Sequence, residues 1–127
     1  MFKSIEHTEI VVCNMDKTLN FYTRILGFSI QSRRRVDRLP LEEVAFIELG
    51  DTLVEVFAVE DPAPVSEEQW QSGCRRIAIE VDDMDEVMAY LKENRVTISQ
   101  EPVITETSAM AELKDPDGIP IQLVQRK

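Results

Sequence analysis

The chain has 127 residues, of which 43% are hydrophobic and 30% are charged, and its net charge is −10. This length fits one domain with a hydrophobic core. The excess of acids excludes most nucleic-acid binding, which needs a basic surface, and disfavours an anionic membrane. No run of 18 apolar residues and no apolar leader occur, so we expect a cytoplasmic protein without a membrane span. Cys13 and Cys74 have no metal or disulfide spacing, and we expect reduced core cysteines.

The first half of the chain predicts one strand, one helix and three further strands. Residues 4–13 alternate between apolar and polar and contain His7, the only histidine, within what reads as a buried strand. Asn14 or Asp16 can cap a helix that runs to Leu26, and Gly27 can end it. Further strands are expected at residues 28–35, 43–49 and 52–58, with a turn at residues 50–51.

The first of these strands carries three consecutive arginines, residues 33–35. In a strand Arg33 and Arg35 share one face and Arg34 points to the other. Two interpretations remain open: a solvated edge strand that resists pairing with other chains, or a small basic rim for an anionic ligand.

A segment rich in proline and acids, residues 60–73, links this half to the second half. Within it "SEEQ", residues 66–69, has the form of a capping box and predicts a helical turn. The second half predicts a strand at 75–82, a helix at 84–94 and strands at 96–99, 108–114 and 119–125. The turn "DPDG" at residues 115–118 combines a proline that fixes φ with a glycine that accepts positive φ.

The two halves share one plan. "HTEIVVCNMDKTLNFY" from His7 aligns with "RIAIEVDDMDEVMAYL" from Arg76, and "TLVEVF" at 52–57 aligns with "IPIQLV" at 119–124. Glu55 therefore matches Gln122. We expect an α+β fold of two βαβββ modules, residues 1–59 and 74–127, joined by the linker within one domain. Because each module is small, we expect the modules to pack on each other, within one chain or between chains.

Strand alternation gathers polar side chains on the sheet faces away from the helices. Buried polar groups on otherwise apolar strands are costly unless they are paired or used. The predicted ligand pocket comprises His7, Glu9, Glu55, Phe57, Arg76, Glu80 and Gln122. Glu55 and Glu9 are its candidate carboxylates for proton transfer.

The repeated unit, together with "FYTRILGF" and "DPDGIPIQLV", resembles the vicinal oxygen chelate superfamily. That superfamily includes glyoxalase I, bleomycin- and fosfomycin-resistance proteins, methylmalonyl-CoA epimerase and extradiol dioxygenases. The resemblance covers nearly the whole chain. It implies curled mixed sheets around a cavity with helices outside, a small-molecule ligand and a homodimer.

The resemblance also implies four metal-ligand positions, which here hold His7, Glu55, Arg76 and Gln122. Arginine has no free lone pair and cannot bind a cation, and the amide of Gln122 brings no negative charge. We therefore expect no cofactor, with Arg76 paired to Glu55, Glu9 or Glu80. The alternative is a weak site for Zn²⁺, Ni²⁺ or Mn²⁺ on His7, Glu55 and Gln122.

Three functions follow from the resemblance. The first is a small-molecule-binding protein similar to the metal-free bleomycin-resistance type, with apolar walls from Leu53, Phe57, Phe46, Met110 and Trp70. The second is a metal-dependent lyase or isomerase, like lactoylglutathione lyase or methylmalonyl-CoA epimerase, that acts through an enediolate or enolate. The third is a non-catalytic partner-binding domain. Extradiol dioxygenases hold iron with two histidines and one carboxylate, and this chain has a single histidine, so we do not expect dioxygenase chemistry.

Overall fold

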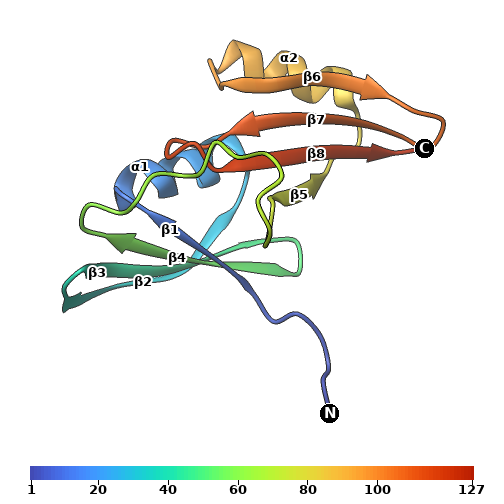
Figure 1. The fold of residues 1–127 in the computed structure, drawn as a ribbon. Coiled ribbons are helices and arrows are strands. Elements are labelled where there is room, and N and C mark those ends of the chain that lie inside the picture. The colour runs from blue at the N-terminus through green and yellow to red at the C-terminus, as the bar shows by residue number, and fades with distance from the viewer. The chain divides into compact units, whose positions relative to one another are not determined.

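The computed structural model describes residues 1–127 and divides them into two compact units, Met1–Pro64 and Val65–Lys127. The first unit contains β1 (Thr8–Val12), α1 (Met15–Asn20), the π-helical segment η1 (Phe21–Ile25), β2 (Ser29–Arg38), β3 (Leu41–Leu49) and β4 (Thr52–Val59). The second contains β5 (Ile77–Glu80), α2 (Met84–Glu93), β6 (Ile98–Ile104), β7 (Ser108–Lys114) and β8 (Pro120–Arg126). Each unit therefore runs strand, helix and three strands (Figure 1).

Each unit builds one four-stranded mixed sheet, and the two sheets have the same plan. The strand order is β1-β4-β3-β2 in the first and β5-β8-β7-β6 in the second. β1 runs parallel to β4 and β5 runs parallel to β8, whereas the remaining pairs are antiparallel. The predicted α+β fold of two βαβββ modules is confirmed.

The first helix begins where the sequence places a cap. The Asn14 side chain accepts a hydrogen bond from the backbone N–H of Lys17 at 3.0 Å, which satisfies one of the unpaired donors of the first turn. The helix continues as η1 and ends at Gly27, whose φ of 83° suits a residue without Cβ. Its buried side chains include Leu19 and Tyr22, so the expected apolar face is present.

Alternation decides which strand residues form the core of the first module. Ile10 and Val12 of β1 and Val54 and Val56 of β4 are buried, and α1 contacts β4. The residues between them, including Glu9 and Glu55, therefore point to the opposite face. This separation is the structural reason that polar groups gather on one side of the sheet.

The second module repeats this arrangement. Asp83 caps α2 by accepting a hydrogen bond from the N–H of Glu86 at 3.0 Å. The predicted "DPDG" turn forms, and buried Asp115 accepts hydrogen bonds from the N–H groups of Asp117 and Ile119, both at 2.9 Å. Residues on the helix-facing side of β7 and β8 are buried: Ala109, Ala111, Leu113, Ile121 and Leu123.

Several expected boundaries are wrong. β1 begins at Thr8, so His7 lies just before the strand and not within it. Residues 66–69 form no helix, because the Ser66 hydroxyl caps only the N–H of Glu68 and a turn follows. β6 extends to residue 104 despite Pro102, since β6 is an edge strand and its pairing shifts between residues 100 and 103.

The expectation of core cysteines is also wrong. Cys13 and Cys74 are both exposed, and neither forms a disulfide. Cys13 follows the last residue of β1, where the chain turns toward α1, and Cys74 lies in the link before β5. Neither position belongs to a buried strand face. No helix combines the length and the apolar character that crossing a membrane requires.

Candidate functional site

The first module brings together three of the predicted site residues. Glu9 on β1 lies beside Glu55 on β4 in the parallel register, so alternation places both on the same face. His7, immediately before β1, lies with its Nε2 3.0 Å from Glu9 Oε2 and 3.3 Å from Glu55 Oε1. One potential ligand atom from each residue lies within 4.8 Å of the others. We call these three residues the His7 cluster.

The imidazole is held from its other side as well. The Glu6 carboxylate contacts Nδ1, and the ring meets the edge of Phe46 with the centroids 5.7 Å apart. The His7 side chain is 26% exposed, while that of Glu55 is only 14% exposed. Hydrogen bonds that the ring donates to the carboxylate of Glu6 first, and then to that of Glu9, raise the pKa of His7 above its ordinary value of 6.5, against a smaller lowering by burial. Sequence reasoning missed Glu6, although its adjacency to His7 was visible.

The second module holds an ion pair at the matching place. Arg76 Nη1 donates to Glu112 Oε2 at 2.5 Å, and both side chains are 14% exposed. The Ser99 hydroxyl donates to the other oxygen of Glu112 at 2.7 Å. Burial tends to raise the pKa of Glu112, but the hydrogen bonds from Ser99 and Arg76 outweigh it and the pKa lies below its ordinary value.

Within the second module the partner of Arg76 is Glu112 of β7, which was not among the predicted partners Glu55, Glu9 and Glu80. Strand pairing explains this: Glu112 lies opposite Gln122, as Phe46 lies opposite Glu55 in the first module. Sequence reasoning considered only the four repeat-related strands, whereas alternation along β7 already places Glu112 on the relevant face.

The remaining predicted site residues lie outside the His7 cluster, and each has other surroundings within its own module. Glu80 ends β5 and is exposed. The Gln122 amide nitrogen lies 3.5 Å from the Met110 sulfur, and its strand neighbour on β5 is Ala78. Phe57 is part-buried on β4, two residues beyond Glu55 on the same face. Trp70 is 77% exposed and carries the Arg75 guanidinium over its ring at 4.4 Å.

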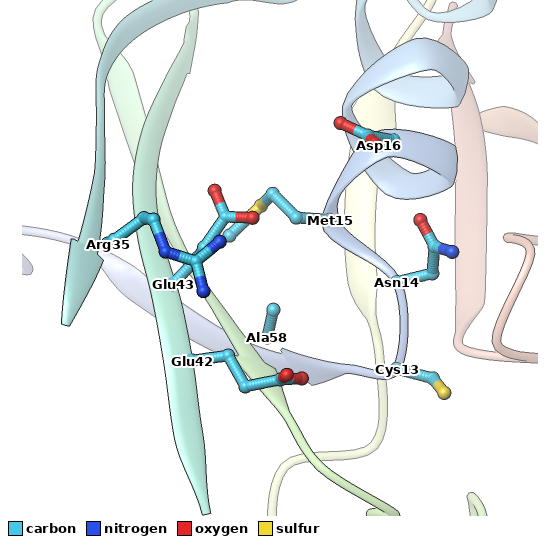
Figure 2. Close-up of a pocket in the computed structure, with 8 residues that line it drawn as sticks. All are labelled: Cys13, Asn14, Met15, Asp16, Arg35, Glu42, Glu43 and Ala58. Carbon is cyan, nitrogen blue, oxygen red and sulfur yellow. The ribbon is translucent and has the colours of Figure 1, made fainter. Parts of the chain in front are cut away.

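The arginine segment is largely neutralised by acids. Arg33 forms ion pairs with Glu43 and Asp16, each at 2.7 Å, and its hydrogen bond holds the pKa of Glu43 below the ordinary value. Nearby, a pocket opens between the start of α1 and strands β2 and β3, with Arg35 and Glu42 among its lining residues (Figure 2). This arrangement favours the solvated edge over the basic rim. None of the predicted site residues lines this pocket.

The two modules differ in their fitness for a metal ion. The His7 cluster offers one imidazole nitrogen and two carboxylates, which is a donor set that Zn²⁺, Ni²⁺ and Mn²⁺ accept. The matching positions of the second module offer a guanidinium and an amide, and the carboxylate of Glu112 beside them is bound to Arg76. The residues of the first module fit a cation, whereas those of the second do not.

Comparison with known proteins identifies the family. Residues 4–123 match the model of the Glyoxalase/Bleomycin resistance protein/Dioxygenase superfamily. A probable lactoylglutathione lyase of Vibrio cholerae is 31% identical, covering 97% of this chain and 91% of its own. A glyoxalase family protein of Enterococcus faecalis superposes with a TM-score of 0.85 at 26% identity, covering 97% and 98% of the two chains.

A second solved structure points to the same family. The trypanothione-dependent glyoxalase I of Leishmania major superposes with a TM-score of 0.79 at 26% identity, covering 98% of this chain and 87% of its own. The matched region includes both modules and both sets of candidate ligand positions. The chain therefore belongs to the Glyoxalase/Bleomycin resistance protein/Dioxygenase superfamily, which is the vicinal oxygen chelate group that its sequence resembles.

Proposed function

We propose that this protein binds a small organic molecule and does not catalyse the glyoxalase-type reaction of its lyase relatives. The observation that carries this proposal is the Arg76–Glu112 ion pair. It occupies the place where the family resemblance implies a second histidine, and it is shielded from solvent, with both side chains 14% exposed. A guanidinium so engaged supplies neither a metal ligand nor a proton acceptor.

Gln122 supports the same conclusion. The resemblance implies a glutamate at this position that both binds metal and carries a proton. An amide does not accept a proton near neutral pH, so Gln122 removes the proton carrier. The second module retains the family fold but has lost both chemical groups that glyoxalase-type proton transfer requires.

The ligand we expect is apolar with a positive charge. The net charge of −10 favours cations over anions as ligands of this chain. On the face of the first sheet away from α1, Phe46 and Phe57 flank the Glu55 carboxylate, so an aromatic surface lies next to a negative group. Such a combination is suited to binding an organic cation.

A thermal-shift screen tests the binding function. We expect cationic aromatic compounds to raise the melting temperature and matched anionic compounds to leave it unchanged. A compound present at a hundred times its Kd should stabilise the folded chain by about 2.7 kcal/mol. E55Q should reduce the shift, while E80Q, which changes an exposed acid of the other module, should leave it unchanged. A screen in which no organic compound binds would refute the proposal.

A second candidate function is favoured by the His7 cluster. Glu9 and Glu55 lie beside one another at a possible cation site, where a carboxylate next to a metal is able to move a proton alpha to a carbonyl group. The name lactoylglutathione lyase of the relatives supports testing lactoylglutathione directly. Our proposal predicts no thioester turnover above background; turnover that disappears in E55Q would favour the lyase.

We further propose a homodimer, which the family resemblance supports. The apolar N-terminal residues Met1, Phe2 and Ile5 are almost fully exposed in the single chain, at 110%, 97% and 89%. Light scattering after size-exclusion chromatography checks the assembly, and a monomer at micromolar concentration would refute it.

A further inference from the structure

We infer that the first module has a further binding site, a polar pocket that takes a small amino acid in its zwitterionic form. The pocket opens between the start of α1 and the strands β2, β3 and β4 (Figure 2). Its lining residue Ala58 follows buried Val56 by two residues, so it lies on the helix side of β4. Glu55 points to the opposite side of the sheet. The inference therefore goes beyond the proposed function, whose ligand contacts the other face.

The size of the pocket limits its occupant. Its volume is about 190 Å³, which is below the roughly 300–1,000 Å³ of sites for drug-sized molecules. The space exists because Ala58 pairs with Glu43, and Glu43 pairs with Arg35, in one row across three strands. The smallest side chain of this row leaves room next to the start of α1. A molecule the size of a small amino acid suits this room.

Two of the three carboxylates that line the pocket are already neutralised. Arg33 joins Asp16 of α1 to Glu43 of β3, with 2.7 Å to each carboxylate, and so ties the helix to the sheet. The third carboxylate belongs to Glu42, which is part-buried and whose side chain forms no ion pair and no hydrogen bond. A part-buried carboxylate without a partner is a place for a cationic group of a ligand.

Arg35 supplies the opposite charge. Its Nη2 atom donates to Asp37 at 3.1 Å, but this pair is exposed, at 67% and 69%, and it uses one of the five N–H donors of the guanidinium. The other donors are open to a carboxylate, whose two oxygens match the fork of a guanidinium. Figure 2 shows the Arg35 guanidinium and the Glu42 carboxylate on either side of Ala58.

These two charges select a ligand that carries both signs. An ammonium group on Glu42 and a carboxylate on Arg35 satisfy both side chains at once. A ligand with a single charge satisfies one of them and is repelled by the other. A molecule that combines an ammonium group and a carboxylate within so small a space is a small amino acid.

Alkylation of Cys13, which lines the pocket, tests the inference in the full chain. Cys13 and Cys74 are the only cysteines and both are exposed, so iodoacetamide should label both, and mass spectrometry of the peptides gives each rate. We expect glycine, β-alanine or γ-aminobutyrate at millimolar concentration to slow the labelling of Cys13 in a saturable manner and to leave Cys74 unchanged. Ethylammonium and propionate, which each carry one of the two charges, should protect neither cysteine.

Variants remove the two charges one at a time. E42Q and R35M should each weaken the affinity for the protecting amino acid at least about tenfold, as the loss of a hydrogen bond between charged groups does. E48Q, on the same strand but outside the pocket, and E55Q, on the opposite face of the sheet, should leave the affinity unchanged. Circular dichroism of each variant verifies that the fold is retained.

Four outcomes overturn the inference. They are no protection of Cys13 by any of the amino acids, equal protection by ethylammonium or propionate, an unchanged affinity in either E42Q or R35M, and a loss in E55Q as large as that in E42Q. The last would place the amino acid on the face assigned to the organic cation. The proposed function is tested separately, because its screen uses aromatic compounds and depends on Glu55.

Discussion

Replacing Arg76 by methionine removes the ion pair that distinguishes the second module. The Arg76 Nη1–Glu112 Oε2 distance is 2.5 Å, and each side chain is 14% exposed. Hydrogen bonds to charged groups contribute about 1.5–3 kcal/mol, and breaking a fully buried pair costs about 3–5 kcal/mol. Ser99 and Lys114 remain near Glu112 and limit the penalty. We therefore expect R76M to lower the free energy of unfolding by about 2 kcal/mol at pH 7.

The pH dependence of this loss follows from Glu112. Its pKa in the folded chain lies below its ordinary value of 4.5, so its carboxylate contributes stability that is present above the unfolded pKa and is lost as pH falls through the folded pKa. In R76M the carboxylate has lost its partner, and protonating it relieves the penalty. The difference between wild type and R76M should be full at pH 7 and should shrink below about pH 4.5.

Urea unfolding of the wild type and of R76M at pH 7 and pH 4 measures the loss of unfolding free energy and its dependence on pH. Arg35→Met provides the matched control, because the Arg35–Asp37 pair is 67% and 69% exposed and should contribute at most about 1 kcal/mol. With Glu112 already changed to glutamine, R76M should cost less than in the wild type. The reasoning is refuted if R76M lowers the free energy of unfolding no more than R35M does, or lowers it equally at both pH values. The Arg76–Glu112 ion pair would then not stabilise the second module.

Three further predictions concern single contacts. NMR titration should place the His7 pKa above 6.5. The E6Q variant should have a lower His7 pKa, because the Glu6 carboxylate stabilises the imidazolium. An unchanged His7 pKa in E6Q would contradict this contact. N14A should destabilise the chain by about 1 kcal/mol in urea, since the cap on Lys17 is lost, whereas N14D should restore it. D115A should cost about 2 kcal/mol through two lost backbone hydrogen bonds, and D115N, which keeps an acceptor oxygen, should cost clearly less.

Most of the fold is predictable from the sequence because the repeat is visible in it. Matching strands and helices in the two halves imply matching modules, and caps such as Asn14 and turns such as Asp115–Gly118 follow from local chemistry. Boundaries such as the start of β1 were less predictable, because they depend on which strand finds a pairing partner. Thr8 pairs with Val54, and His7 has no such partner.

The grouping of His7, Glu9 and Glu55 is predictable from alternation combined with the repeat. The partner of Arg76 was not, because it depends on the register between β7 and β8, which the sequence alone does not determine. Phe46 lies opposite Glu55 in the β3–β4 pair and Glu112 lies opposite Gln122 in the β7–β8 pair, so Phe46 and Glu112 occupy equivalent positions. This equivalence shows how one module retains its histidine against an aromatic ring while the other has an ion pair.

A crystal structure of the protein grown with Zn²⁺ tests most directly the claim that the Arg76–Glu112 ion pair has replaced metal chemistry in the second module. The account predicts that Arg76 stays bound to Glu112 and that no anomalous zinc peak lies at Gln122. A zinc ion bound by Gln122, or an Arg76 guanidinium that no longer pairs with Glu112, would contradict it.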